Sequence, residues 1–280
     1  MKVAKIISTC FIKRLYRDKT ILTGDPLGYF GHSQIFESPQ DIIDLIKFNI
    51  SIEKKTNPGV KSRDLIIVNN DVGYKKGNKF LKKLSGTKIP FGKIKVLNRK
   101  NIGMSFGAYN DGFKKYRHKY DYFLFTEDDC IISRQNYLKT GIDIFKKIKK
   151  AGYVAYTHST KVDKKYFEEL GLKSYNPISC HGAIGLSSKI LLNKIYKKYG
   201  KLPHYEGNIY EKCILYGEVA FPNSFIQMGY KIIDLPKKLT FYTPACDLMR
   251  GIKYKKWPNL LEKFVYYFKE CYYKFFSFFR

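Results

Sequence analysis

The feature that most constrains the fold is a regular alternation of short apolar β-type runs with segments of helical periodicity. Strand-like runs occupy residues 2–12, 65–68, 94–97 and 122–125. Apolar residues at helical spacing predict helices between them, over residues 39–56, 78–84 and 104–116. Alternating strands and helices predict an α/β fold with a doubly wound, mostly parallel sheet, whose ligands lie beyond the carboxyl ends of the strands.

The pattern is weaker after residue 131, where we expect a strand at residues 153–156 and helices near residues 137–149, 189–199 and 219–228. No internal repeat and no low-complexity linker divides the chain. A chain of 280 residues with this pattern can form one domain. We therefore expect a single catalytic domain over residues 1–245, followed by a shorter loop and tail over residues 246–280.

Composition narrows the class of protein. Hydrophobic residues make up 44% and aromatic residues 16% of the chain, which excludes a disordered polar protein. The six cysteines lie far apart and form no Cys-x-x-Cys pair, so a zinc site or a disulfide framework is not expected. The first eleven residues show no secretory signal, and we expect a cytoplasmic protein with reduced thiols.

The charge is strongly positive, with 52 basic against 24 acidic residues and a net charge of +28. A surface of this kind attracts polyanions such as nucleic acid, an anionic membrane or a phosphorylated substrate. The sign of the charge does not choose among these partners. A general lysine bias of the source proteome explains the same composition equally well.

Three consecutive acids, Glu127, Asp128 and Asp129, directly follow the apolar run at residues 122–125. Adjacent carboxylates repel one another, by about 4 kcal/mol for a 4 Å pair at an intermediate dielectric constant, so such a cluster needs a cation or strong donors. A hard divalent cation with oxygen ligands is the natural partner at the carboxyl end of a strand. A solvated turn neutralised by nearby lysines is the alternative.

This cluster resembles the Asp-x-Asp signature of GT-A glycosyltransferases, with Glu127 and Asp129 at its two acidic positions. Three further segments follow the order seen in the family 2 group of these enzymes. They are the Asn-x-Gly segment at residues 101–110, the small-residue acceptor-side segment at residues 179–185, and the segment with the catalytic acid at residues 216–221. The resemblance covers roughly residues 1–240 and implies a GT-A, Rossmann-like fold.

The resemblance also implies a reaction and a set of site residues. It implies an enzyme, a hexosyltransferase-type glycosyltransferase, that moves a sugar from a nucleotide-sugar donor to a glycan or glycolipid with inversion. Asp129, with Glu127, would hold Mn²⁺ or Mg²⁺, and Glu218 would act as the catalytic base. His181 and Gly182 would lie on the acceptor side. The donor-binding residues implied are Asp71, Asn101, Gly103, Gly107, Asn110, Glu127 and Asp128.

Structural roles are the alternatives for several of these residues. Glu218 suits the N-terminus of a helix, Gly103 and Gly107 suit close helix packing, and His181 suits a hydrogen-bonded structural position. The sequence also departs from the family pattern. The aspartate expected at the end of the second strand is matched by Asn69 or Asn70, with Asp71 displaced.

The segment after residue 245 has two expected parts. Residues 247–253 predict a lid that brings Arg250 or Lys253 to the diphosphate, with a plain surface loop as the alternative. Residues 258–280 predict an amphipathic helix with a wide aromatic face, too often interrupted by charge to span a membrane. We expect this helix to lie on the inner face of an anionic membrane and the acceptor to be lipid-linked, such as lipopolysaccharide or a capsule-type glycan. Packing of the tail against the domain or a second copy is the alternative.

Two other functions fit parts of the sequence. A nucleic-acid-binding protein would use the same positive charge, but the basic residues form no recognisable module, so nucleic acid is not an expected partner. A GT-A-like nucleotidyltransferase would also bind nucleotide and metal. The lack of a glycine-rich basic loop after the first strand argues against that reaction.

Overall fold

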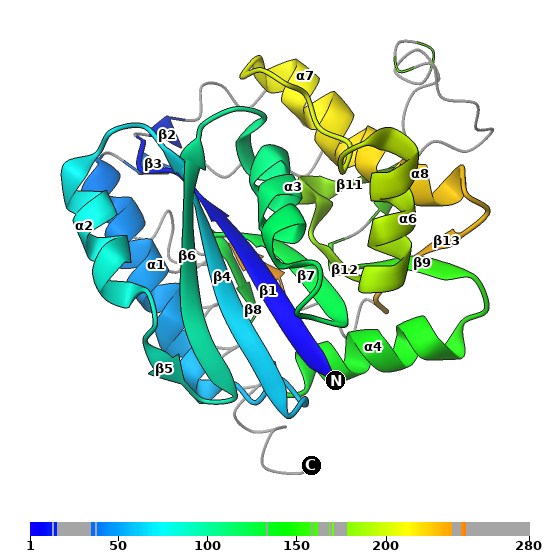
Figure 1. Ribbon diagram of the computed structural model, residues 1–280, viewed down its shortest axis with the longest axis horizontal. Helices are drawn as coiled ribbons and strands as arrows, with labels where there is room; N and C mark the ends of the chain where they lie inside the picture. Colours follow the sequence, from blue (N-terminus) through cyan, green and yellow to red (C-terminus); the bar gives the residue numbers. More distant parts are fainter. Residues whose placement is uncertain are drawn as a thin grey trace, which may run out of the picture.

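The computed structural model describes residues 1–12, 14–15, 35–36, 38–132, 134–157, 159–161, 168, 170, 178–236 and 242–244. Within them the chain forms three layers, an eight-stranded sheet covered by helices on both faces (Figure 1). The expected lid with Arg250 and Lys253 and the expected tail helix lie outside the described residues.

The sheet is mixed and mostly parallel, as predicted. Its strand order is β13-β9-β12-β7-β1-β4-β6-β5, and β7, β1, β4 and β6 run parallel to one another. β12 is antiparallel to both of its neighbours, and β13 is parallel to β9. The strands are β1 (Lys2–Thr9), β4 (Ser62–Asp71), β5 (Lys88–Ile89), β6 (Gly92–Lys100), β7 (Tyr122–Glu127), β9 (Ala151–Ala155), β12 (Gly185–Ser188) and β13 (Lys231–Asp234).

Helices pack on the two faces of the sheet through separate hydrophobic clusters. α1 (Pro39–Lys55), α2 (Lys75–Leu84) and α4 (Tyr137–Lys147) cover one face. α3 (Met104–Tyr116), α6 (Lys189–Tyr199) and α8 (Phe221–Ile226) cover the other. The remaining elements are β2 (Arg14–Leu15), β3 (Ile35–Phe36), β8 (Cys130–Ile132), β10 (Ser159–Lys161), β11 (Ile178–Cys180), η1 (His181–Ala183), α7 (Tyr210–Ile214), η2 (Leu215–Ala220) and β14 (Tyr242–Pro244).

The central strand shows why the apolar runs are continuous rather than alternating. In β1, Val3 and Ile7 pack toward α4 and α1, while Ala4 and Ile6 pack toward α3. A parallel strand that is covered on both faces needs apolar side chains at successive positions. The run that predicted the strand is therefore the consequence of helices on both sides.

Several element boundaries agree with the sequence. The helices predicted at residues 104–116 and 189–199 have those bounds in α3 and α6. At the start of α1 the carboxylate of Asp41 accepts a hydrogen bond from the backbone N–H of Ser38 at 3.0 Å, a contact typical of a helix N-terminus.

Two elements differ from the expectation. The helix expected near residues 219–228 begins earlier, at Tyr210, and runs through α7, the π-helical turn η2 and α8. The four-residue strand β12 has no sequence signal of its own, because glycine and serine fill three of its positions. Among the described residues, no helix is long and apolar enough to cross a membrane.

Candidate active site

The acidic turn lies at the carboxyl edge of the sheet and is held from two sides. The backbone N–H of Asp128 donates to the carbonyl of Ser8 at 3.0 Å, and the Thr9 hydroxyl donates to the Asp128 carboxylate at 2.6 Å. From α1, the amide of Asn49 donates to the carbonyl of Asp128 at 3.1 Å and to that of Cys130 at 3.3 Å. Asp128 is 1% exposed, and its contact with Thr9 ties the turn to the end of β1.

Three segments that are distant in sequence meet beside this turn. The backbone N–H of Gly182 in η1 donates to Glu218 Oε1 at 2.7 Å. A Cβ atom placed on Gly182 would lie 3.1 Å from Glu127 Oε2, so this glycine also lies against the end of β7. Glu127, Gly182 and Glu218, each singled out from the sequence, therefore lie together in the structure.

Two further side chains complete the surroundings of Glu218. The hydroxyl of Ser179 donates to Glu218 Oε2 at 3.4 Å, so each carboxylate oxygen has a donor. His181 Nδ1 lies 3.6 Å from Glu218 Oε1, and the imidazole is 64% exposed. The carboxylate of Glu218 is thus held in place while one side of it borders an exposed imidazole.

The backbone of η1 is strained and anchored. Gly182 has φ 60° and Ala183 has φ 44°, which places a residue with a side chain in the left-handed region. The Tyr109 hydroxyl donates to the carbonyl of Gly182 at 3.1 Å, and the Tyr153 hydroxyl donates to that of Ala183. A strained backbone persists where the surrounding structure fixes it, and such places are frequent at functional sites.

Glu218 lies in the π-helical turn η2, a type of turn that is rare and often found at functional sites. Gly217 explains how this turn packs, because a Cβ atom there would lie 2.0 Å from the ring of Phe106 in α3. Close contact between α3 and η2 therefore requires glycine at this position and fixes where the next residue, Glu218, points.

The electrostatics of the site favour the binding of a cation. Burial and, after it, the nearby carboxylates of Asp129, Glu218 and Asp128 together raise the pKa of Glu127 to about 8, although a hydrogen bond from Ser105 lowers it. Carboxylates gathered in this way ionise together only when a cation is present. A divalent cation that prefers oxygen ligands would relieve this repulsion.

The residues present fit an open metal site rather than a closed one. Among the described residues, no group of three His, Cys, Asp or Glu side chains has an arrangement that could hold a metal ion. Asp129, which is 6% exposed, and Glu127 would supply two carboxylates. Mg²⁺ and similar ions commonly take the rest of their ligands from substrate phosphates and water.

The polar residues at the ends of β4 and β6 are engaged within the protein. Asp71 accepts hydrogen bonds from the backbone N–H of Gly73 at 2.8 Å and from the amide of Asn78 at 2.9 Å. Asn70 donates to Ser8 at 3.2 Å and accepts from Arg99. The role of Asp71 in donor binding stays a prediction.

The predicted donor segment at the start of α3 is hydrogen-bonded to another part of the chain, the segment that precedes α7. The backbone N–H of Gly103 donates to the carbonyl of Gly207 at 2.7 Å, and the amide of Asn208 donates to the carbonyl of Asn101 at 2.6 Å. Asn110 accepts from the backbone N–H of Leu202 at 2.9 Å. These contacts tie the start of α3 to the segment before α7.

Gly107 is explained by packing. A Cβ atom there would lie 2.1 Å from the carbonyl oxygen of Ile102 and 2.8 Å from Arg99 Nη2. The structure therefore favours the packing alternative for this glycine. A direct role for Gly103, Gly107, Asn101 or Asn110 in donor binding stays a prediction.

Several residues of the site, among them Tyr153 and the four that follow, were not singled out from the sequence. Thr9 and Asn49 hold the acidic turn. Tyr109 contacts η1, and Ser105 donates a hydrogen bond to Glu127. Ser105 and Tyr109 are four residues apart on α3 and so share one helix face, which was the available signal. Nothing local marks Thr9 or Asn49, because their partners lie 119 and 79 residues away.

Comparison with known proteins gives similarities of fold. Neither a protein-family model nor a curated protein sequence matches the chain. The structure of S. aureus TarS 1–349 matches with a TM-score of 0.46 and 12% identity, over 86% of this chain and 60% of that one. The Pyrobaculum calidifontis mannosyltransferase PcManGT, in complex with GDP-Man and Mn²⁺, matches with a TM-score of 0.49 and 11% identity, over 84% of this chain and 55% of that one.

A nucleotidyltransferase is also among the matches. CMP:2-keto-3-deoxy-manno-octonic acid synthetase, in complex with CTP, matches with a TM-score of 0.44 and 11% identity, over 84% of this chain and 89% of that one. The chain spans less than two thirds of the two glycosyltransferase structures. These similarities concern the path of the chain through a mixed α/β sheet, and the activities are those of the matched proteins.

Proposed function

We propose that this protein is a metal-dependent glycosyltransferase that transfers a sugar from a nucleotide-sugar donor to a glycan or lipid-linked glycan acceptor. The observation that carries the proposal is the meeting of Glu127, Gly182 and Glu218 at the carboxyl edge of the sheet. These residues come from three of the four segments whose order along the chain resembles GT-A glycosyltransferases.

In this proposal Asp129 and Glu127 hold the divalent cation, Mn²⁺ or Mg²⁺. When bound, such an ion neutralises the negative charge that develops on the leaving diphosphate. The raised pKa of Glu127 supports this role, because the side chain ionises fully at neutral pH only beside a positive charge. Thr9 and Asn49 keep the turn in position through Asp128 and Cys130.

Glu218 is the proposed base. The acceptor hydroxyl oxygen bonds to the anomeric carbon, the bond from that carbon to the diphosphate oxygen breaks, and the hydroxyl proton passes to Glu218. The donors from Gly182 and Ser179 fix the carboxylate for this step. A single displacement of this kind inverts the anomeric centre. His181, which is exposed beside Glu218, is proposed to contact the acceptor.

The remaining parts of the proposal concern the acceptor and the location. We propose a lipid-linked acceptor of the lipopolysaccharide or capsule type, and attachment of residues 258–280 to the inner face of an anionic membrane. Arg250 and Lys253 are proposed to close over the diphosphate. Deleting residues 258–280 and measuring co-sedimentation with anionic vesicles tests the attachment, and unchanged sedimentation would contradict it.

The experiment that tests the reaction is incubation with a panel of nucleotide sugars, including GDP-mannose and UDP-GlcNAc, with Mn²⁺ or Mg²⁺. We expect release of nucleoside diphosphate from one donor, and loss of this release by at least about 100-fold in Glu218→Gln, the scale of a general base. Asp129→Asn should abolish release and also weaken metal-dependent donor binding. Glu206→Gln is the matched control, since this carboxylate is exposed and pairs with Lys201 far from the acidic turn in sequence.

The same experiment separates the rival functions. A nucleotidyltransferase would release pyrophosphate from a nucleoside triphosphate and leave nucleotide sugars intact. A nucleic-acid-binding protein would hydrolyse no donor and would bind polyanions with a steep dependence on salt. Equal activity of Glu218→Gln and the wild type would contradict the assignment of Glu218 as the base.

A further inference from the structure

One flank of the molecule, formed by α2, β5 and β6, carries many exposed basic side chains. Between Asp71 and Asp111 the sequence has ten Lys or Arg residues and no Asp or Glu. Two of the ten are paired within the fold, Lys95 with Asp64 at 2.9 Å and Arg99 with Asp111 at 2.5 Å. The other eight are exposed and form what we call the basic face: Lys75, Lys76, Lys79, Lys82, Lys83, Lys88, Lys93 and Lys100.

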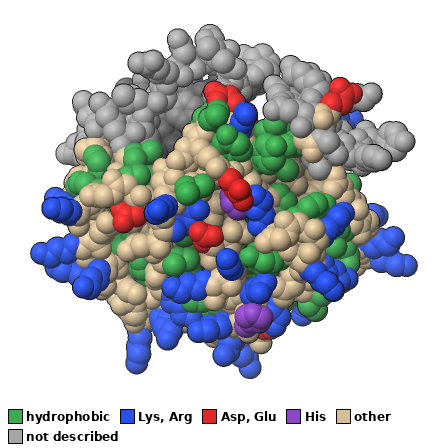
Figure 2. Space-filling model, turned by 45° about the horizontal axis from the view of Figure 1, so that its top comes forward, with side chains coloured by type: hydrophobic (Ala, Val, Ile, Leu, Met, Phe, Trp, Pro, Cys, Tyr) green, Lys and Arg blue, Asp and Glu red, His purple; other side chains and the backbone are tan. Residues whose placement is uncertain are grey.

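Within the part of the chain that the structure describes, none of these eight lysines forms an ion pair. Figure 2 shows Lys and Arg side chains standing out along the left flank, the side on which α2 and β6 lie in Figure 1. An uncompensated field of this kind attracts an anionic surface.

The arrangement of lysines on α2 works against the stability of that helix. Lys75, Lys79 and Lys83 follow one another at i, i+4 spacing, where like charges repel. The first turn contains Lys75 and Lys76 and no acid, although the positive end of the helix dipole disfavours cations there. At 100° per residue the five lysines of α2 lie within an arc of about 120°. An anionic partner along this stripe would relieve each of these unfavourable interactions.

The neighbouring hairpin repeats the pattern. Lys88 of β5 lies directly opposite Lys93 of β6, and like charges in such a cross-strand pair are destabilising. Lysines on an edge strand also prevent pairing with other chains, which is sufficient reason for those on β6. Protection of a strand edge does not explain the lysines of α2, because they belong to a helix.

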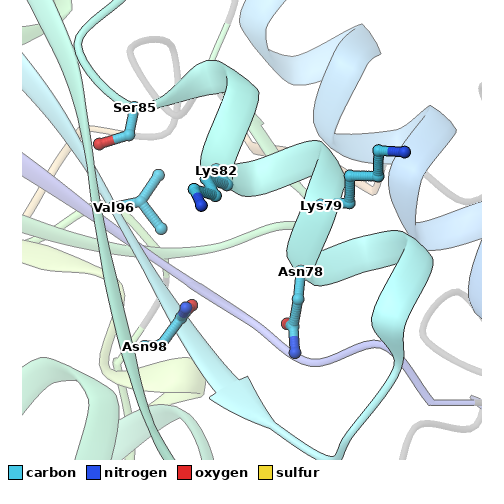
Figure 3. Close-up of a pocket in the computed structure, with 6 residues that line it drawn as sticks. All are labelled: Asn78, Lys79, Lys82, Ser85, Val96 and Asn98. Atoms are coloured by element: carbon cyan, nitrogen blue, oxygen red, sulfur yellow. The ribbon is translucent and has the colours of Figure 1, made fainter.

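A groove between α2 and β6 opens on the basic face. It encloses about 410 Å³ and is lined by Asn78, Lys79, Lys82, Ser85, Val96 and Asn98. Figure 3 shows Lys82, Ser85 and the two asparagine amides around the gap, with the amine of Lys79 directed away toward α1. The ammonium group of Lys82, the hydroxyl of Ser85 and the amide N–H groups of Asn98 are donors that suit the oxygens of a phosphate group.

An exposed phenylalanine borders the same face. Phe91 is 39% exposed at the tip of the β5–β6 hairpin, between Lys88 and Lys93 along the chain. Its φ of 70° is unfavourable for a residue with a large side chain, so the position favours glycine unless the ring itself is useful. Aromatic rings beside lysines are typical of surfaces that lie at the membrane interface.

We propose that the basic face docks on an anionic phospholipid surface, with its lysines over the headgroups, a lipid phosphate in the groove and Phe91 at the interface. This proposal concerns a surface other than the predicted tail helix and does not depend on the reaction. It would place α2 and β6 against the bilayer.

The test compares two variants of the full chain that remove the same charge. In one, Lys75, Lys79, Lys82 and Lys83 become glutamine. The control changes Lys146, Lys147, Lys197 and Lys198, which are exposed lysines in the last turns of α4 and α6. Co-sedimentation is measured with vesicles of phosphatidylcholine alone and with added phosphatidylglycerol. Since four bases are removed from the contact, we expect the first variant to bind anionic vesicles about tenfold or more weakly, and the control nearly as the wild type.

Two further arms sharpen the result. Phe91→Ser should weaken vesicle binding without changing the salt dependence, because it removes no charge. Equal losses in the two lysine variants would overturn the proposal and leave only net charge as the cause. Unchanged vesicle binding with lost binding of single-stranded RNA would overturn it in favour of nucleic acid. The melting temperature of each variant is measured beside its vesicle binding, and a loss of binding in a first variant that melts like the wild type is assigned to the contact.

Discussion

Replacing Glu53 by glutamine tests a charged cluster buried between α1, β1 and β4. The Glu53 carboxylate accepts a hydrogen bond from Lys5 Nζ at 2.6 Å and one from the Tyr137 hydroxyl at 3.0 Å, and it forms an ion pair with Arg63. Lys5 and Arg63 are 0% exposed and Glu53 is 1% exposed. One carboxylate therefore serves two cations that have no contact with water.

The expected cost follows from what the substitution leaves behind. Glu53→Gln keeps the volume but removes the negative charge, and breaking a buried pair in this way costs about 3–5 kcal/mol. Lys5 can respond by losing its proton, because burial lowers its pKa to about 7. Arg63 has no such route, since a guanidinium stays charged at neutral pH. We expect a loss of about 3–5 kcal/mol in the free energy of unfolding at pH 7.

Urea unfolding followed by circular dichroism measures this loss. Asp143→Asn is the control, because Asp143 pairs with Lys139 at 2.5 Å while both side chains are more than half exposed, and such a surface pair contributes about 0–1 kcal/mol. In a double-mutant cycle, Lys5→Met and Glu53→Gln should couple by about 1 kcal/mol or more. A loss in Glu53→Gln no larger than in Asp143→Asn would refute the reasoning.

Three other predictions test the packing and titration of the fold. Asn49→Leu removes the amide donor from the carbonyls of Asp128 and Cys130 and should cost about 1–3 kcal/mol in the free energy of unfolding. The same substitution should weaken Mn²⁺ binding, and an unchanged Mn²⁺ affinity would show that Asn49 does not position the acidic turn for the metal. Burial raises the pKa of Asp64, but hydrogen bonds from Lys95 and two other donors outweigh it and hold the pKa below its usual value of 3.8. This carboxylate therefore stabilises the fold above about pH 4, and the stabilisation is lost as the pH falls through the folded-state pKa; Asp64→Asn should flatten that part of the stability curve, and an unchanged acid limb would contradict the assignment. Gly107→Ala should cost about 1–3 kcal/mol, because its methyl group would lie 2.1 Å from the carbonyl oxygen of Ile102, and a thermal shift near zero would show that α3 can move.

The elements with strong local patterns could be predicted from the sequence. The continuous apolar runs of β1, β4 and β7 and the amphipathic helices α3 and α6 follow from residues within each segment. β12 could not, because glycine is required at position 185 by the ring of Tyr153, which a Cβ atom would approach to 2.3 Å. The π-helical turn η2 likewise depends on the contact between Phe106 and Gly217. These features are set by partners in other parts of the chain.

The candidate site also contains residues that could be predicted from the sequence and residues that could not. Glu127 follows a strand and Glu218 belongs to a segment with a recognisable order, so both could be named from the sequence. Thr9 and Asn49 could not, since an ordinary threonine and an ordinary helical asparagine acquire their roles only when β1 and α1 meet the acidic turn. Gly103 and Gly107 stood out as glycines, and the structure connects them to packing of α3.

The central place of β1 in the sheet has a consequence for how the chain folds as it is made. β1 leaves the ribosome before its partners, yet Val3 pairs with Arg63 on one side and with Tyr122 on the other. Until those residues are synthesised, a strand with apolar side chains on both faces has no permanent neighbour. Pairings between such distant segments form slowly, and the intermediates that precede them expose apolar surface and are prone to aggregate. Nascent chains shorter than about half of the sequence should therefore depend on chaperones that shield β1.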